Sequence, residues 1–257
     1  MSDTVSDTTV SSDTVPSDTA PPFLVIGAGR GGTSVLAAAL AGHSRLVVAM
    51  ELFGLSHLLG MDLAQGGDTD IFSTRTRAFR EGCLAEVRRH PDRIWGNKIT
   101  TEHLFGLEDH NAANPPYADM IDRFFRDVVP EFRIIFIIRD GRACVASKVR
   151  RTGQSWEQAA FRWHYAVQVL AAVRRLDRPV CEIRFEDLVA EPVPALEAAC
   201  RCLGVAFEPA MLAQTQSSAM LPEYRRPGFE ADRAAVPEVP PHVAAFLRPA
   251  LDFCGYA

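Results

Sequence analysis

The chain has 257 residues, which is enough for one α/β domain with a substantial buried core but cramped for two independent domains. Its formal charge of −5 is misleading, because four of its 32 acidic residues lie among the first 22 residues, where lysine and arginine are absent. The remainder holds 27 basic and 28 acidic residues, and such a neutral body argues against a general nucleic-acid-binding protein.

The apolar runs and the cysteines of the sequence indicate where the protein is located and whether it binds a metal. No apolar run reaches the roughly 18 to 20 residues of a membrane-spanning helix, and the N-terminus lacks the basic and apolar regions of a secretory signal. We therefore expect a cytoplasmic protein that does not contact membranes. The six cysteines are scattered, without a CxxC pair or histidines at metal-ligand spacing, so we expect reduced thiols and no metal site.

The N-terminal residues 1–22 repeat units similar to Ser-Asp-Thr and contain almost nothing to bury. We expect them to form a disordered tail. A recruitment or phosphorylation tail is the alternative, which nothing in the sequence favours over a solubilising appendage. Residues 23–257 are expected to form a single domain.

From Phe23 onward, short β-rich runs alternate with helical stretches. We expect strands at 23–28, 45–50, 93–97, 133–138 and 179–184. We expect helices near 32–42, 74–90, 117–129, 141–151, 155–176, 192–203 and 240–253, with loops at 66–68 and 114–116. This alternation predicts an α/β fold of three layers, α/β/α, with a mostly parallel central sheet and ligands outside the carboxyl ends of the strands.

A glycine-rich stretch, GAGRGGTS at residues 27–34, joins the first predicted strand to the first predicted helix. Such a turn presents several backbone N–H groups and the positive end of the helix dipole at one place, so it forms an anion site before any side chain is considered. The alternative is that these small residues only allow close helix–strand packing. That packing alone would not need Arg30 in the turn.

The spacing within this stretch is compatible with three anions. The glycines match a dinucleotide fingerprint, and Glu51, 19 residues past Gly32, lies where a ribose-binding acid belongs. A kinase-type phosphate loop is less favoured, because Thr33 replaces its lysine. A sulfonate-binding loop explains Arg30, since a cation there would neutralise the charge that builds on the bridging oxygen during sulfuryl transfer.

A second candidate site follows the fourth predicted strand. Arg139 and Asp140 come directly after its apolar run, and Ser147 lies eight residues after Arg139, on the helix that begins near Gly141. An arginine at a strand end and a hydroxyl on the next helix make a second anion site, separate from the first. The alternative is an ion pair between Arg139 and Asp140 that caps the helix.

Together the two motifs resemble those of the sulfotransferases that use 3′-phosphoadenosine 5′-phosphosulfate (PAPS), in the bacterial and Golgi-like branch of the P-loop-type enzymes. In that family a strand–loop–helix with R/K-x-G-T-[TS] holds the phosphosulfate, and a later R-D/N with a serine eight residues on holds the 3′-phosphate. Residues 183–192 look like the family's RYEDL…P segment, and 202–205 continue like its FLG. The resemblance covers about residues 23–215 and implies the P-loop-like sulfotransferase fold.

The resemblance implies a set of donor-binding residues on both motifs and beyond them. They are Arg30, Gly31, Gly32, Thr33, Ser34, Arg139, Ser147, Phe185, Arg225 and Arg226. Phe185 replaces a tyrosine that contacts adenine in some members, so we expect ring stacking without the hydrogen bond. Arg30 replaces the lysine of the cytosolic branch and is expected to act as an electrostatic clamp, because a guanidinium does not readily release its proton.

Transfer to a hydroxyl benefits from a base that removes the acceptor's proton. The resemblance implies Glu51 for this role, as in the Golgi tyrosine and bacterial branches, and His57 is the second choice. Glu102 and His103 are further candidates near the crevice. Lys98 lies in a stretch similar to the family's NKDP segment, which implies a second cation on the transferring group.

We therefore predict a cytoplasmic sulfotransferase that moves a sulfuryl group from PAPS to a hydroxyl of a small-molecule acceptor and releases adenosine 3′,5′-bisphosphate, with no metal. One alternative is an NAD- or flavin-dependent oxidoreductase that uses the glycine-rich loop. The other is a non-catalytic nucleotide-binding protein of the same fold. A second anion site suits a 3′-phosphate and is superfluous for NAD, which favours the sulfotransferase.

Overall fold

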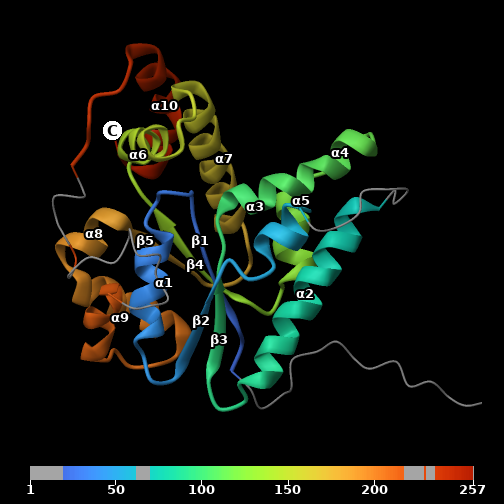
Figure 1. Cartoon of the computed structure of the whole chain (residues 1–257), viewed down its shortest axis with the longest axis vertical. Coiled ribbons are helices and arrows are strands. Elements are labelled where there is room, and N and C mark those ends of the chain that lie inside the picture. The colour runs from blue at the N-terminus through green and yellow to red at the C-terminus, as the bar shows by residue number, and fades with distance from the viewer. Residues whose placement is uncertain (1–19, 62–69, 217–228, 230–234, 257) are drawn as a thin grey trace, which may run out of the picture.

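Five parallel strands form the centre of the fold, at the positions predicted from the sequence (Figure 1). The structure is a computed structural model that describes residues 20–61, 70–216, 229 and 235–256. The strands are β1 (Phe23–Ile26), β2 (Leu46–Met50), β3 (Ile94–Lys98), β4 (Arg133–Ile138) and β5 (Val180–Arg184). Their order is β2-β3-β1-β4-β5 and every pairing is parallel, which confirms the predicted α/β fold.

Side chains of the strands enter two hydrophobic cores, one on each face of the sheet. In β4, Ile134, Phe136 and Ile138 pack into one core, while Ile135 and Ile137 pack into the other. All five are buried, which explains why this strand is a continuous apolar run rather than an alternating one. Helices therefore have to cover both faces.

The helices form the two outer layers (Figure 1). One face carries α1 (Thr33–Ala41), α8 (Phe185–Ala190), α9 (Pro192–Leu203) and the 3-10 helix η4 (Pro209–Gln216). The other carries α2 (Ile71–Arg89), α5 (Met120–Arg123), α6 (Gly141–Thr152), α7 (Trp156–Arg174) and α10 (Pro241–Cys254). Short helical turns complete the chain: η1 (Gly54–Leu58), α3 (Thr101–Phe105), η2 (Gly106–Glu108), α4 (Asp109–Ala113) and η3 (Phe124–Val128).

The structure differs from the predicted helices in a few places, each with a local cause. The helix expected at 117–129 is split into α5 and the π-helical turn η3. Helix α2 begins at Ile71 rather than near 74, because the Asp70 carboxylate accepts the Ser73 N–H at 3.2 Å and caps the helix there. The turns at 54–58, 101–113 and 185–190 were not predicted, since they are too short to show a hydrophobic period.

Two predictions fall on residues outside those that the structure describes. The tail predicted for 1–22 lies outside them up to residue 19, and so does the loop predicted at 66–68. Among the helices that are described, none has the length and apolar character needed to cross a membrane.

Gly96 of β3 provides a test of the sheet's packing. A Cβ atom at this position would collide with the ring of Phe23, which is fully buried. Gly96→Ala is therefore expected to lower the free energy of unfolding by about 1–3 kcal/mol, measured by urea denaturation. The control is Gly153→Asn, where φ is +70° and no atom lies within 4 Å, so that a residue tolerant of left-handed backbone should be nearly neutral. Equal stabilities of the two variants would contradict the close packing at Gly96.

Candidate active site

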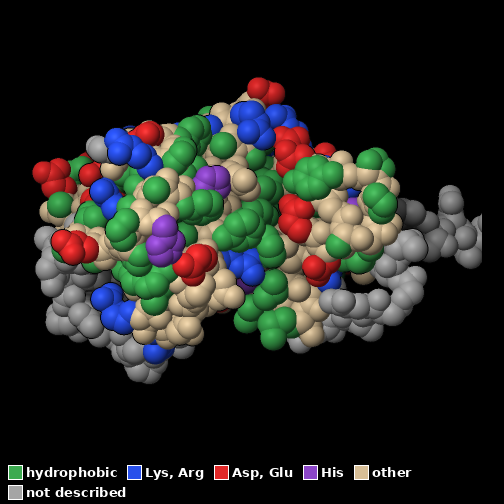
Figure 2. Space-filling view, turned by 90° about the horizontal axis from the view of Figure 1, so that it is seen from above, with side chains coloured by type: hydrophobic (Ala, Val, Ile, Leu, Met, Phe, Trp, Pro, Cys, Tyr) green, Lys and Arg blue, Asp and Glu red, His purple; other side chains and the backbone are tan. Residues whose placement is uncertain are grey.

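The carboxyl ends of the strands meet at one edge of the sheet, and the predicted site residues lie there. β3 lies between β1 and β2, with Lys98 in register with Val25 on one side and Met50 on the other. Arg139 follows β4, the neighbour of β1 on its other side. Figure 2 looks down on this edge and shows a hollow with basic side chains near its centre and hydrophobic and acidic side chains around it. The topology thus gathers residues that are far apart in the sequence.

The glycine-rich loop forms a tight turn that opens α1. The Gly31 N–H donates to the carbonyl oxygen of Ala28 at 2.8 Å, and Gly32 precedes the helix with φ +97°. A side chain at Gly32 would also collide with the Phe185 ring, so backbone angle and packing both require glycine here. Gly32, as a glycine, has no side chain that could cap α1. The first N–H groups of the helix have no partner within it and form a place where an anion can bind.

Glu102 holds this loop from the side of β3. The Gly29 N–H donates to both carboxylate oxygens of Glu102, at 3.1 and 2.9 Å, and Lys148 of α6 forms an ion pair with the same carboxylate. A Cβ atom at Gly29 would lie 2.9 Å from a Glu102 oxygen. Burial acts to raise the pKa of Glu102, but the Lys148 charge and the Gly29 hydrogen bonds outweigh it and lower the pKa. Glu102 is thus engaged in holding the loop.

The two predicted anion sites adjoin each other. Nε of Arg30 donates to Oγ of Ser147 at 3.2 Å, and Nη1 of Arg139 donates to the carbonyl oxygen of Arg30 at 3.2 Å. Burial lowers the pKa of Arg139; Cys144 and Glu186 oppose this effect, and the positive charge of Arg30 adds to it. The two predicted anion sites are therefore adjacent to each other in the structure.

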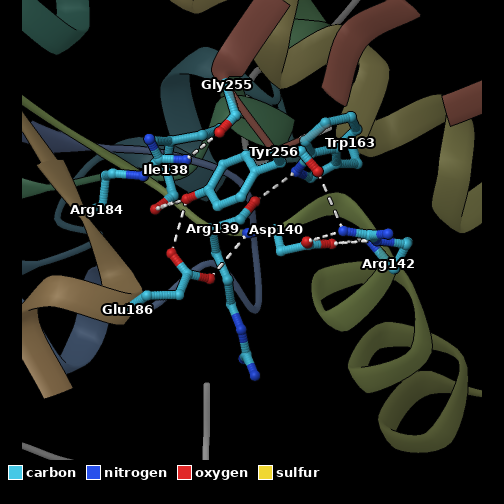
Figure 3. A network of polar contacts seen from close by, with 9 residues as sticks. All are labelled: Ile138, Arg139, Asp140, Arg142, Trp163, Arg184, Glu186, Gly255 and Tyr256. Atoms are coloured by element: carbon cyan, nitrogen blue, oxygen red, sulfur yellow. Dashed lines mark hydrogen bonds and ion pairs between the residues drawn. The ribbon is translucent and has the colours of Figure 1, made fainter. Parts of the chain in front are cut away.

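Asp140 forms its ion pair with Arg142 rather than with Arg139. Its Oδ1 accepts the Arg142 N–H at 2.8 Å, and its Oδ2 lies 2.6 Å from Nη2 of Arg142. Asp140 therefore caps α6 through Arg142. Figure 3 shows the Arg139 side chain extending away from this pair, and the indole N–H of Trp163 donates to the Arg139 carbonyl at 3.1 Å.

Phe185 contacts both of the predicted anion-binding elements. Its ring is fully buried, it fills the space next to Gly32, and the Arg139 guanidinium lies 4.4 Å from its centroid. This contact is a cation–π interaction. The ring thus fixes the end of β4 relative to the start of α1, while stacking on adenine stays a prediction.

Glu51 and Lys98 form an ion pair at the ends of β2 and β3. Nζ of Lys98 lies 2.5 Å from Oε1 of Glu51, and Nε2 of His103 lies 3.8 Å from Oε2. Lys98 is buried with 4% of its surface exposed, whereas the Glu51 side chain is 35% exposed. The carboxylate is therefore held from below by a buried cation and remains open to a molecule in the hollow.

The His103 ring faces Glu51 in its neutral form. Its Nδ1 accepts the backbone N–H of Thr100 at 3.2 Å, so the neutral ring carries its proton on Nε2, the atom nearer Glu51. Burial lowers the pKa of His103 and outweighs the Glu51 charge, which acts to raise it. The imidazole is therefore uncharged at neutral pH.

Asn97 is a site residue that the sequence interpretation missed. Its fully buried amide accepts the Leu52 N–H at 3.2 Å and donates to the Leu52 carbonyl at 2.7 Å. Glu51 and Phe53, the residues before and after Leu52, have φ of +59° and +63°, which is strained backbone for residues with side chains. Asn97 therefore stabilises the turn that presents Glu51. The available signal in the sequence was a polar amide in a stretch predicted to be a strand.

The family relationship follows from a profile match that covers most of the chain. The profile described as "Sulfotransferase family" matches residues 21–209. The chain belongs to the sulfotransferase family. It is thus a sulfotransferase-family enzyme, and the donor of this family is PAPS. No curated protein sequence matches the chain.

Solved structures support the sulfotransferase fold. The sulfotransferase domain from the curacin biosynthetic pathway is 17% identical with a TM-score of 0.65, covering 93% of this chain and 99% of that one. The sulfotransferase domain of the Synechococcus PCC 7002 olefin synthase is 16% identical with a TM-score of 0.63, covering 95% and 98%. A sulfotransferase from Alicyclobacillus acidocaldarius is 19% identical with a TM-score of 0.50, covering 90% and 93%.

Most of the predicted sulfotransferase residues lie at this edge. Thr33 is buried and Ser34 partly buried in the first turn of α1. His57 stacks on Phe53 with ring centroids 5.4 Å apart, and its buried Nδ1 has no hydrogen-bond partner. Arg225 and Arg226 fall outside the described residues. Within the described ranges, no cluster of three or more His, Cys, Asp or Glu residues is placed to hold a metal ion.

The lowered pKa of His103 predicts a dependence of stability on pH. Below its ordinary value of 6.5 the unfolded chain binds a proton that the folded protein resists, so stability falls as the pH falls from about 6.5 towards the folded pKa. His103→Gln keeps an acceptor for the Thr100 N–H but cannot titrate. In urea unfolding between pH 7 and 5, the variant should lose less stability than the wild type.

Glu102 affects the stability of the fold in a different pH range and does not interfere with the test of His103. Because its pKa is lowered from 4.5, its stabilisation is present above about pH 4.5 and is lost only as the pH falls through the folded value. The same slope in wild type and His103→Gln between pH 7 and 5 would show that His103 is not held neutral by the fold.

Proposed function

We propose that this enzyme transfers the sulfuryl group of PAPS to a hydroxyl group of a small-molecule acceptor. The observation that carries the proposal is the meeting of Arg30, Arg139 and Ser147 at the N-terminus of α1, where the N-cap residue is Gly32. The paired Glu51 and Lys98 lie along the same edge, at the ends of β2 and β3, on the side of β1 away from β4. One region thus offers cations and N–H groups for the two anionic groups of the donor, and a second offers a carboxylate for a proton.

The residues present fit both charged ends of this donor. Gly31 and Gly32 leave the loop without side chains, and a Cβ atom at Gly31 would lie 2.8 Å from the Ala28 carbonyl, so the backbone itself forms a cradle. We assign this cradle, Arg30, Thr33 and Ser34 to the 5′-phosphosulfate. The bound donor supplies a sulfuryl group that is activated by its phosphate leaving group.

Arg139 and Ser147 are assigned to the 3′-phosphate. The guanidinium groups of Arg30 and Arg139 lie close enough in a partly buried site for the charge of one to lower the pKa of the other. Bringing like charges together in this way is unfavourable, and a bound anion relieves it. The hydrogen bond from Arg30 to Ser147 places the clamp for one phosphate beside the site for the other.

Glu51 is assigned as the base. Its partly exposed carboxylate accepts the proton of the acceptor hydroxyl as the acceptor oxygen forms its bond to sulfur and the bond from sulfur to the bridging phosphate oxygen breaks. Lys98 holds Oε1 of the carboxylate from the protein side, and the neutral His103 ring lies 3.8 Å from Oε2. Lys98 also places a positive charge near the transferring group.

Donor binding is tested by removing the groups assigned to the 3′-phosphate. A hydrogen bond to a charged group contributes about 1.5–3 kcal/mol, so Arg139→Ala and Ser147→Ala should each weaken binding of adenosine 3′,5′-bisphosphate about 10- to 100-fold in isothermal titration calorimetry. Binding of adenosine 5′-phosphate should change far less. Arg150→Ala, which removes an exposed charge from the same helix, is the control and should bind as the wild type does.

Two results would contradict the donor assignment. One is unchanged affinity for the bisphosphate in both variants. The other is a thermal shift of the wild type with NAD that equals or exceeds the shift with adenosine 3′,5′-bisphosphate, which would favour the oxidoreductase.

The base is tested with a labelled donor and a panel of phenols, alcohols, amines and sugars, from which an accepted hydroxyl compound is chosen. Glu51→Gln preserves shape but cannot take a proton, so kcat should fall at least about 100-fold while donor affinity is retained. His57→Gln should keep most of the activity. If Glu51→Gln turns over normally and His57→Gln does not, the base is His57.

A further inference from the structure

The peptide that joins Arg139 to Asp140 is held at both of its polar atoms. The Arg139 carbonyl accepts the indole N–H of Trp163 at 3.1 Å, and the Asp140 N–H donates to Oε1 of Glu186 at 3.0 Å. The orientation of this peptide determines where the Arg139 side chain leaves the backbone. Figure 3 shows that side chain extending away from the peptide on the side opposite Trp163.

Glu186 is in turn held by a residue from the far end of the chain. The hydroxyl of Tyr256 donates to Oε2 of Glu186 at 2.7 Å and lies 3.4 Å from the carbonyl oxygen of Ile138 in β4. Glu186 stands in the first turn of α8, whereas Tyr256 follows α10. The two oxygens of one carboxylate thus connect the C-terminal segment to the end of β4 (Figure 3).

Two arginines fix Tyr256 in this position. The Arg184 guanidinium lies 4.1 Å from the centroid of the Tyr256 ring, and its Nη2 donates to the Gly255 carbonyl at 2.8 Å. Nη2 of Arg142 donates to the Tyr256 carbonyl at 3.2 Å while Arg142 is also paired with Asp140. The ring and the backbone of Tyr256 are therefore anchored independently of its hydroxyl.

Glu186 lies close to Arg139. It accepts the N–H of the residue that follows Arg139, and it follows Phe185, whose ring centroid lies 4.4 Å from the Arg139 guanidinium. The negative charge of Glu186 acts to raise the pKa of Arg139, against the larger effect of burial. The Tyr256 hydroxyl remains protonated at neutral pH, since burial and the Glu186 contact raise its pKa. It is therefore a permanent donor that satisfies one carboxylate oxygen, while the Asp140 N–H satisfies the other.

We propose that Tyr256 is a positioning residue for recognition of the 3′-phosphate: its hydroxyl holds the Glu186 carboxylate on the Asp140 N–H and prevents it from pairing with Arg139 in competition with the phosphate. This inference rests on the proposed assignment of Arg139 to the donor. It adds a residue from outside both sequence motifs to the donor site.

The test compares affinities for adenosine 3′,5′-bisphosphate and adenosine 5′-phosphate in isothermal titration calorimetry. Tyr256→Phe keeps the ring under Arg184 and loses only the hydroxyl, so it should weaken bisphosphate binding three- to tenfold and leave adenosine 5′-phosphate unchanged. Glu186→Gln removes the competing charge and should not weaken bisphosphate binding. In that background, adding Tyr256→Phe should have no further effect on the preference for the 3′-phosphate.

Matched controls separate this role from a general loss of structure. Tyr117→Phe removes the hydroxyl of an exposed tyrosine and should bind both nucleotides as the wild type does. A global effect of Tyr256→Phe would weaken both nucleotides equally, and that outcome would overturn the inference. So would an unchanged preference in Tyr256→Phe, or an equal loss in the Glu186→Gln background.

The same measurements distinguish this inference from the function on which it rests. A wild type that does not prefer the bisphosphate over adenosine 5′-phosphate would overturn both the donor assignment and the role of Tyr256. A wild type with that preference, combined with a Tyr256→Phe variant that retains it, would overturn only the role of Tyr256.

Discussion

The site depends on one close approach, that of the Phe185 ring to the backbone of Gly32. The ring is fully buried, excludes any side chain at Gly32 and carries the Arg139 guanidinium at 4.4 Å. One aromatic side chain therefore sets the spacing between the start of α1 and the end of β4. Because protein interiors are close-packed, neither element can shift without the other. The proposed recognition of anions at this edge thus depends on a hydrophobic contact.

The acidic residues around this contact are placed so that the edge stays basic. Three carboxylates each have a basic partner: Glu51 with Lys98, Glu102 with Lys148, and Asp140 with Arg142. Their charges are compensated locally, and the backbone N–H groups that they accept also fix the loops. The part of the chain after residue 22, which is about neutral, can therefore keep a positive surface where the sheet ends.

The sequence predicted what depends on local pattern and on topology. All five strands were placed within a few residues, and Ser147 was placed on the helix that follows β4, where the structure has α6. The partners could not be predicted: the contact of Ser147 with Arg30 spans 117 residues, and that of Tyr256 with Glu186 spans 70. Such contacts depend on how loops pack in three dimensions, and no periodicity or spacing records that. Asn97 was missed for a different reason, since its role is to satisfy the backbone of the turn that follows β2.

The end of β3 serves both halves of the proposed reaction. Over six residues, the end of β3 supplies Asn97 and Lys98, which hold the Glu51 turn, and the start of α3 supplies Glu102, which holds Gly29 of the proposed donor loop. The Glu51 turn and the glycine-rich loop are both held by residues near the end of β3. An acceptor oriented by Glu51 would therefore already be oriented toward the donor. Much of the entropy of bringing two reactants together would then be removed when the chain folds rather than when the substrates bind.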